Sequence, residues 1–141
     1  MKTLAQQIEN YGFAVRMIPA EADYPAFAYT IGLWERYQHP EIIILGLPIE
    51  TMHHILNNVG EAVQSGTQFS VGNRYQDIVN QYPVAFVEVE KRYFSEYFGQ
   101  AIHYYGTENF TALQLLWTDK NGKFPFEKDF DEKLKKLQSL G

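Results

Sequence analysis

Cysteine is absent from this chain of 141 residues. Its absence excludes disulfide bonds, thiolate nucleophiles and metal sites with cysteine ligands. Long apolar runs are missing too: the longest extends from Ile42 to Leu47, whereas a membrane-spanning helix needs about 20 apolar residues. The first residues also lack the apolar core of a signal peptide. We therefore expect a soluble, cytoplasmic protein that does not enter a membrane.

An excess of positive charge is likewise missing. Lys and Arg number 12 against 17 Asp and Glu, which gives a formal net charge of −5. Because nucleic-acid binding relies on basic surface, we expect no nucleic-acid partner. The expected partner is an unknown small molecule or protein, and a homo-oligomer is also compatible with the composition.

Aromatic residues are abundant, with ten Tyr, ten Phe and two Trp. Such side chains fill cores and also line ligand pockets, and we favour the core as the main reason for their number. The length fits a single domain that comprises residues 1–141.

Hydrophobic patterns predict the elements of this domain. The first helix begins with a capping box at Thr3 and Gln6 and ends near Gly12. Alternating residues predict strands over 13–18 and 26–33, and a continuous apolar run predicts a strand over 41–47 that is covered on both faces.

The second half of the chain follows similar rules. Apolar residues at spacings of three and four predict a helix from Pro48 to about Gly66. Further strands are expected over 67–72, 83–90 and 111–119, and further helices over 94–105 and 129–137. Since strands follow one another without intervening helices, we predict an α+β fold with a mostly antiparallel or mixed sheet and about four helices packed on it.

The step His39-Pro40-Glu41 is one candidate for chemistry. A residue before proline is extended, and residues two apart in an extended chain point to the same side. His39 and Glu41 would then converge, and a carboxylate can orient a histidine as a base or a metal ligand. The alternative is that the step ends a loop and Glu41 caps backbone groups where the strand begins.

Other reactive patterns are weak or missing. His53 and His54 are adjacent and would point about 100° apart on a helix, so they do not converge on one ligand. The sequence has no serine nucleophile motif and no glycine-rich phosphate loop. We identify no metal site and no cofactor, and the sequence leaves open whether the protein is an enzyme.

Polar and aromatic residues at the ends of the expected strands suggest a ligand site. The proposed ligand-binding residues are Tyr29, Thr30, His39, Glu41, Trp117 and Asp119. Gln114 stands in an apolar strand, where burial would require a hydrogen-bond partner.

Several stretches together resemble the bacterial domain-of-unknown-function family four-two-six-two (DUF4262). The matching stretches are Tyr29-Thr30-Ile31-Gly32-Leu33, His39-Pro40-Glu41, Gly46-Leu47-Pro48, Tyr104-Tyr105-Gly106, Gln114-Leu115-Leu116-Trp117-Thr118-Asp119 and Gly122-Lys123-Phe124-Pro125. The chain departs from the family pattern at Phe126, where Trp is usual, and at Thr118, where Pro is common. The resemblance covers nearly the whole chain and implies a single-domain bacterial protein, without an established activity.

The leading interpretation is a small ligand- or protein-binding module. One alternative is a flavin- or metal-dependent enzyme on a fold like that of a split barrel. The other is an immunity or toxin-associated protein whose acidic surface would contact a basic partner.

Overall fold

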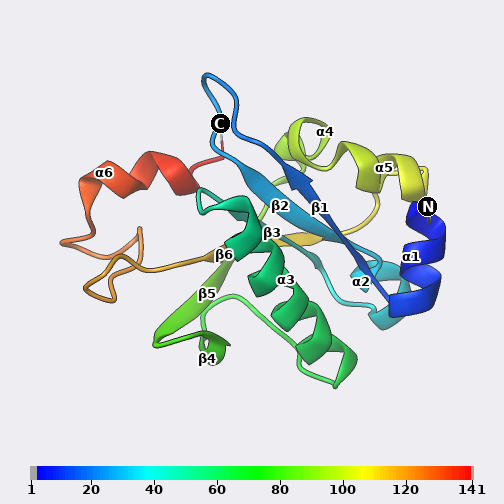
Figure 1. Cartoon of the computed structure of the whole chain (residues 1–141), viewed down its shortest axis with the longest axis horizontal. Coiled ribbons are helices and arrows are strands. Elements are labelled where there is room, and N and C mark those ends of the chain that lie inside the picture. Colours follow the sequence, from blue (N-terminus) through cyan, green and yellow to red (C-terminus); the bar gives the residue numbers. More distant parts are fainter. Residues whose placement is uncertain (1–2, 141) are drawn as a thin grey trace.

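The computed structural model describes residues 3–140. In it, six strands form one mixed sheet with helices packed on it (Figure 1). The strands are β1 (Ala14–Ile18), β2 (Phe27–Ile31), β3 (Glu41–Leu45), β4 (Arg74–Val79), β5 (Tyr82–Glu88) and β6 (Ala112–Leu116). Their order in the sheet is β1-β2-β3-β6-β5-β4. Strands β3 and β6 are parallel, and the other neighbours are antiparallel. The predicted α+β class with a mixed sheet is confirmed.

Helices cover this sheet. The α-helices are α1 (Leu4–Tyr11), α2 (Leu33–Tyr37), α3 (Ile49–Gln64), α4 (Phe94–Tyr97), α5 (Gly99–Tyr105) and α6 (Glu132–Lys135). About four were predicted; the difference comes from short pieces, since α2, α4 and α6 have five, four and four residues. Within residues 3–140, no helix combines the length and the apolar character that crossing a membrane requires.

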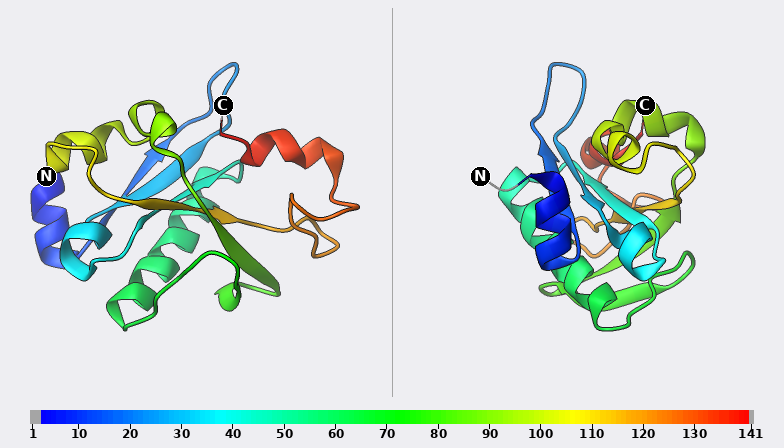
Figure 2. Two further views of the ribbon diagram at one scale, coloured as in Figure 1. Left: turned by 180° about the vertical axis from the view of Figure 1, so that it is seen from behind. Right: turned by 90° about the vertical axis from the view of Figure 1, so that its right-hand side faces the viewer.

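The core lies in two layers, one on each side of the sheet. On one side α3 packs on the sheet, with Met52, Leu56 and Val59 fully buried. On the other side α1, α4 and α5 contribute to a layer rich in Phe and Tyr. Figure 2 shows α3 and the α4–α5 segment on opposite sides of the strands. All five residues of β3 are buried, as predicted for a strand covered on both faces.

Several predicted elements differ from the structure. The strand expected over 111–119 ends at Leu116, and the helix expected over 129–137 consists of α6 and a 3₁₀ turn over Lys136–Gln138. The strand expected over 67–72 is irregular chain, and β4 forms after it instead, at 74–79. The helix expected over 94–105 is interrupted at Phe98, whose backbone leaves the helical region before α5 begins. The strand expected over 26–33 ends at Ile31, because Gly32 turns the chain with a φ of 116° into the unpredicted helix α2.

Candidate functional site

Glu41 is a fully buried carboxylate at the beginning of β3. Five groups donate hydrogen bonds to it. They are the Thr30 hydroxyl at 2.8 Å, the backbone N–H groups of Gly32 at 3.0 Å, Leu33 at 3.3 Å and Trp34 at 3.2 Å, and the Tyr105 hydroxyl. Three of these donors are the unpaired N–H groups at the N-terminal end of α2. Glu41 therefore satisfies the start of a helix that has no side-chain cap of its own.

Burial and hydrogen bonding act in opposite directions on this carboxyl group. Burial raises the pKa of Glu41 from 4.5 to about 6, although the hydrogen bonds led by that of Tyr105 work against the increase. Burial and the charge of Glu41 also raise the pKa of the Tyr105 hydroxyl well above its usual value. The donors come from β2, the start of α2 and α5, so the Glu41 cluster connects the turn between β2 and β3 to α5.

His39 does not converge with Glu41, and the structure instead fits the alternative, in which Glu41 caps backbone groups where the strand begins. Its Nε2 accepts a hydrogen bond from the backbone N–H of Phe69 at 3.0 Å, and its ring packs edge-on against the Phe69 ring, in the core layer of α3. Glu41 belongs to the opposite side, with Ile43. The alternation rule fails because β3 begins at Glu41, so His39 precedes the regular pleat.

The remaining candidates also make internal contacts. The Tyr29 hydroxyl accepts a hydrogen bond from the N–H of Gln100 at 3.1 Å. Trp117 donates its indole N–H to the Leu45 carbonyl at 2.7 Å. Asp119 accepts hydrogen bonds from the backbone N–H groups of Asn121, Lys123 and Asp131, and these bonds, that of Lys123 first, lower the pKa of Asp119.

The six predicted residues therefore do not form one site. Thr30 and Glu41 are in contact, whereas Trp117 and Asp119 lie at the other end of the sheet. Glu41 pairs with Ala112, and Trp117 follows five residues later along a parallel strand. At about 3.3 Å per residue, this places Trp117 about 16 Å further along the sheet.

A groove that the sequence did not reveal runs between α3 and β4. It consists of three adjoining hollows with volumes of about 420, 630 and 210 Å³. The first two share Asn58, Gln76, Asp77 and Ile78, and the second and third share Thr51, Ile55 and Val79. We call this feature the α3–β4 groove. Its central volume is in the range of small-molecule sites.

An irregularity in the sheet shapes this groove. Tyr75 pairs with Val84 and Val79 pairs with Tyr82, so residues 76–78 of β4 stand opposite Pro83 alone. Proline has no N–H to donate, so the ladder is interrupted there and β4 bulges. In the bulge Asp77 has a φ of 71°, and the Ile78 carbonyl accepts a hydrogen bond from Asn58 of α3 at 3.2 Å.

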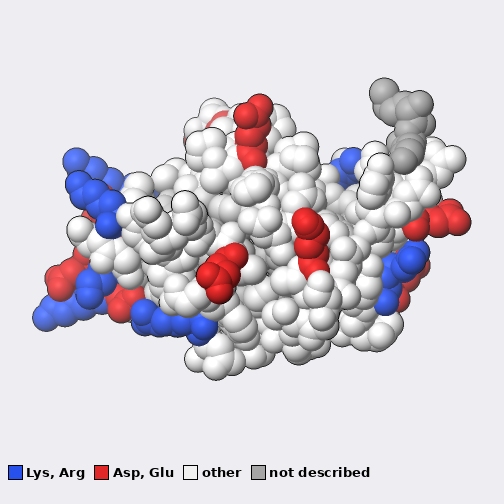
Figure 3. Space-filling model, turned by 60° about the horizontal axis from the view of Figure 1, so that its bottom comes forward, with Lys and Arg blue, Asp and Glu red and all other residues white. Residues whose placement is uncertain are grey.

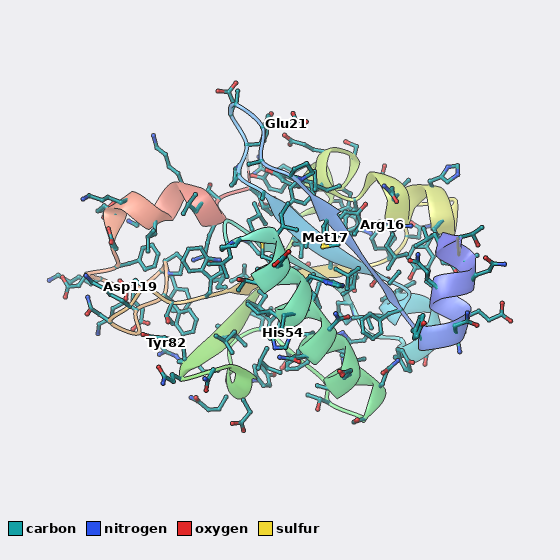
Figure 4. All side chains as sticks on the ribbon, in the orientation of Figure 1. Arg16, Met17, Glu21, His54, Tyr82 and Asp119 are labelled. Atoms are coloured by element: carbon teal, nitrogen blue, oxygen red, sulfur yellow. The ribbon has the colours of Figure 1, made fainter. Side chains whose placement is uncertain are left out.

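The groove changes character along its length. Its central hollow mixes polar and apolar surface. It is lined by hydroxyl, imidazole, amide and carboxylate groups of Thr51, His54, Asn58, Gln76, Asp77, Asn80 and Gln81 together with Ile55, Ile78 and Val79. The end hollow is mainly apolar, lined by Leu47, Thr51, Ile55, Val79, Tyr82, Pro83, Trp117 and Thr118. Figure 4 shows His54 on the side of α3 nearest β4.

Charge is sparse in this part of the molecule. The face turned forward in Figure 3 carries separate carboxylates on a largely uncharged surface, and many of its Lys and Arg side chains gather at the end that holds the C-terminal segment. This face therefore has no extended patch of one charge sign.

Sequence reasoning did not identify the residues that line this groove, apart from Trp117. His54 was dismissed because it has no partner at helical spacing, and β4 was not predicted as a strand. Pro83 inside a strand was the available signal, since a missing N–H implies an irregular neighbour. That signal could not be used without knowing which segment pairs with β5.

Comparison with known proteins yields one match. The model of the family described as "Domain of unknown function (DUF4262)" matches residues 7–131. No curated protein and no solved structure matches significantly. Among residues 3–140, no group of three or more His, Asp or Glu side chains is arranged to hold a metal ion.

Proposed function

The chain belongs to the DUF4262 family, as its motifs predicted, and we propose that it is a binding protein whose ligand lies in the α3–β4 groove. The ligand is a small amphipathic molecule, with a polar part in the central hollow and an apolar part in the end hollow. The observation that carries this proposal is the bulge opposite Pro83, which opens β4 where a regular strand would close the sheet against α3.

The central hollow offers both hydrogen-bond donors and hydrogen-bond acceptors. Thr51 and His54 contribute from α3, and Gln76 and Asp77 contribute from the bulge. The side chains of His54, Gln76 and Asp77 are exposed. Such a lining suits a ligand with several hydroxyl or amide groups, because one carboxylate and one imidazole provide little net charge.

The end hollow suits an apolar group. Its walls include Leu47, Ile55, Val79 and Trp117. Because the indole N–H of Trp117 is already bonded to the Leu45 carbonyl, the ring surface is the part that remains for a ligand. The Oγ1 of Thr118, at the same hollow, is buried and has no hydrogen-bond partner in the described part of the chain. A ligand donor or acceptor could satisfy it.

The strained backbone supports the same assignment. A positive φ is unfavourable for a residue with a side chain, and such residues concentrate at functional sites. Asp77 and Gln81 both have a positive φ, and both line the central hollow.

Of the six residues first considered, this proposal retains Trp117 as a direct ligand contact. Thr30 and Glu41 would act indirectly, by holding the turn before β3. Tyr29, His39 and Asp119 would position α5, the 67–72 segment and the C-terminal loop, respectively.

Tryptophan fluorescence provides a direct test. The chain has two Trp residues, and Trp117 lines the groove while Trp34 is at the start of α2. In Trp34→Phe protein only Trp117 emits, and in Trp117→Phe protein only Trp34 emits. The probe is the pool of small molecules released when protein purified from its host without added ligand is denatured. We expect the pool to change the emission of Trp117 and to leave that of Trp34 unchanged.

The same experiment separates the alternatives. A response of Trp34 alone would overturn the groove assignment. A released flavin would be recognised by its own absorbance and would favour the enzyme alternative. If the pool produced no response, and only a host protein retained by the chain changed Trp117, the partner would be macromolecular and the small-ligand proposal would be wrong.

A further inference from the structure

A separate hollow of about 290 Å³ lies on the other side of the sheet, between the β1–β2 loop and α4. Its lining consists of Ile18, Pro19, Glu21, Tyr24, Phe27, Glu96 and Tyr97. None of these residues belongs to the α3–β4 groove. We call this feature the aromatic–acidic pocket. Figures 1 and 4 show the loop that carries Glu21 extending away from the sheet, near α4.

Three aromatic rings contribute to the pocket. Phe27 and Tyr97 form its buried part, with their ring centroids 5.1 Å apart in an edge-to-face arrangement. Tyr24 is 45% exposed and lies at the mouth. The face of an aromatic ring carries negative potential, so rings around a hollow attract a cation.

Two carboxylates complete the lining. Glu21 and Glu96 are both exposed, and neither forms an ion pair in the described part of the chain. Interaction with the Glu96 carboxylate raises the pKa of the Tyr24 hydroxyl. The β1–β2 loop and α4 therefore present their polar groups to the same pocket.

The loop itself is held by its backbone. The N–H of Glu21 donates to the Tyr24 carbonyl at 3.0 Å, and the N–H of Tyr24 donates to the Glu21 carbonyl at 3.1 Å. This closed pair of bonds fixes where both side chains leave the chain. A site that is already formed loses less conformational entropy when it binds a ligand.

We propose that the aromatic–acidic pocket binds an alkylammonium group, with its positive charge between the rings of Tyr24, Phe27 and Tyr97 and the carboxylates of Glu21 and Glu96. Rings alone would accept any apolar group, and carboxylates alone would accept any cation. The combination selects a cation that also has apolar surface, which describes methylated or alkylated ammonium ions.

The basic residue on this face of β1 does not occupy the pocket. Arg16 precedes Ile18 by two residues, and its charge acts on Tyr29. Burial raises the pKa of the Tyr29 hydroxyl, and Arg16 is among the groups that oppose this rise. It is not part of the pocket lining, so it does not neutralise Glu21 or Glu96 from within. Figure 4 shows Arg16 and Glu21 well separated along the β1 hairpin.

The test is a titration of the full-length protein followed by the backbone amide signals of the pocket in nuclear magnetic resonance spectra. The probe is choline, and the reference is its uncharged carbon analogue, in which a tert-butyl group replaces the trimethylammonium group. We expect saturable shifts at Glu21, Tyr24 and Tyr97, with the charged compound binding at least about fivefold more tightly. Equal affinity for the two compounds, or no saturable shift with choline, would overturn the proposal.

Three variants distinguish a loss of the Tyr24 ring from a general disturbance of the fold. Tyr24→Ala removes a ring at the mouth and should weaken choline binding about fivefold, as the cost of one exposed cation–π contact suggests. Tyr24→Phe keeps the ring and should bind as the unmodified protein does, within about twofold. Phe126→Ala removes another exposed ring, which stacks on Phe124 outside the pocket, and should leave the affinity unchanged. An identical loss in all three variants would contradict the proposal.

A second arm identifies the source of the ammonium group. A peptide with one trimethyllysine carries the same head group as choline. Tighter binding of the peptide than of choline would assign the pocket to a protein ligand, and equal binding would assign it to a free ammonium compound. Either result supports the pocket chemistry. If the released small molecules failed to change Trp117 emission, the groove proposal would be wrong, but the choline titration would be unaffected. The two proposals therefore fail independently.

Discussion

Glu41 illustrates how a single residue organises a turn. Its carboxylate accepts hydrogen bonds from three consecutive backbone N–H groups, those of residues 32–34, and from two hydroxyl groups. An isolated buried charge would be very costly, but full hydrogen bonding offsets much of that cost. The residue therefore holds together the start of α2, β2 and α5.

Replacing Glu41 by Gln tests this role. The Gln side chain has one oxygen instead of two, so its NH₂ group would face donors, and we expect a loss of about 1–3 kcal/mol in the free energy of unfolding. Urea denaturation measures it. Glu9→Gln, at an exposed position of α1, is the control and should change stability by less than about 0.5 kcal/mol. A loss no larger than that of the control would show that the cluster is not stabilising.

Glu41 should also make the free energy of unfolding depend on pH. The folded pKa of about 6 exceeds the unfolded value of 4.5, so the folded protein binds the extra proton between these two pH values. The contribution of Glu41 to stability is therefore present below pH 4.5 and is lost as pH rises through 6, by about 2 kcal/mol. We expect this component of the pH dependence to be absent in Glu41→Gln protein; identical pH profiles would contradict it.

For His39 we expect the opposite pH dependence: its contribution to the stability of the fold should increase as pH rises. Because its Nε2 accepts from Phe69, the proton of the neutral ring is on Nδ1, which donates to the Pro40 carbonyl at 2.8 Å. Burial lowers the pKa of His39 below 6.5, so its contribution to stability is present above pH 6.5 and is lost as pH falls through the lowered value. Nitrogen chemical shifts, assigned by replacing each histidine in turn, measure this titration. A His39 midpoint above 6.5 would contradict the burial argument.

At the scale of elements, α3 shows that a helical pattern is also a packing surface. Gly60 is buried in α3, and a Cβ placed on it would lie 2.2 Å from the Phe13 ring. Alanine ordinarily favours a helix over glycine by about 1 kcal/mol. Here the ring would have to move, and overpacking of a core costs about 1–3 kcal/mol.

We therefore expect Gly60→Ala to destabilise the protein by about 1–2 kcal/mol, measured as the free energy of unfolding in urea. Gly99→Ala is the matched control, because Gly99 is also helical and a Cβ there would have no neighbour within 4 Å. The control should be neutral or stabilising. Similar effects of the two substitutions would show that Phe13 adapts without cost.

The bulge in β4 makes a further prediction at this scale. Glycine adopts a positive φ without strain, so Asp77→Gly should stabilise the protein by up to about 1 kcal/mol. It also removes a polar group from the groove and should weaken ligand binding. Asp129→Gly relieves the same kind of strain, at a φ of 73°, outside the groove. It should stabilise without affecting Trp117 fluorescence titrations; equal effects on binding would contradict the groove assignment.

At the scale of the whole molecule, Gln138 near the C-terminus packs against the sheet through hydrogen bonds to Gln114 and Trp117. The side chain of Gln138 accepts from the N–H of Trp117 at 3.0 Å and donates to its carbonyl at 2.9 Å. Gln114 donates to the Gln138 carbonyl at 2.7 Å, which is the partner that a buried Gln in an apolar strand requires. Residues from two distant parts of the sequence, 114–117 and 138, thus share one polar cluster beside the groove.

Gln138→Ala leaves two buried backbone groups of Trp117 unpaired, and we expect a loss on the order of 3 kcal/mol in unfolding free energy. Hydrogen exchange at the Trp117 amide should accelerate in parallel. Gln100→Ala, an exposed position of α5, serves as the control and should change neither quantity. An unchanged exchange rate in Gln138→Ala protein would show that water replaces the side chain at no cost.

The elements that sequence patterns predicted well are those with strong periodicity. The buried strand β3 and the 16-residue helix α3 were recognised because their apolar residues follow one period without interruption. β4 was missed because its sequence, RYQDIV, has no regular alternation, and its bulge depends on Pro83 of another strand. α2 was missed because its start is capped by Glu41, which follows it in the chain.

The sequence by itself determined the family, the α+β class, the strand β3 and the polar residues that require partners. Local periodicity and local motifs carry this information, since they depend on neighbours along the chain. The tertiary structure alone decided that His39 and Glu41 face opposite sides, that Trp117 borders a groove, and that two glutamates and three rings surround a second pocket. These features depend on contacts between residues far apart in sequence, which no local pattern specifies.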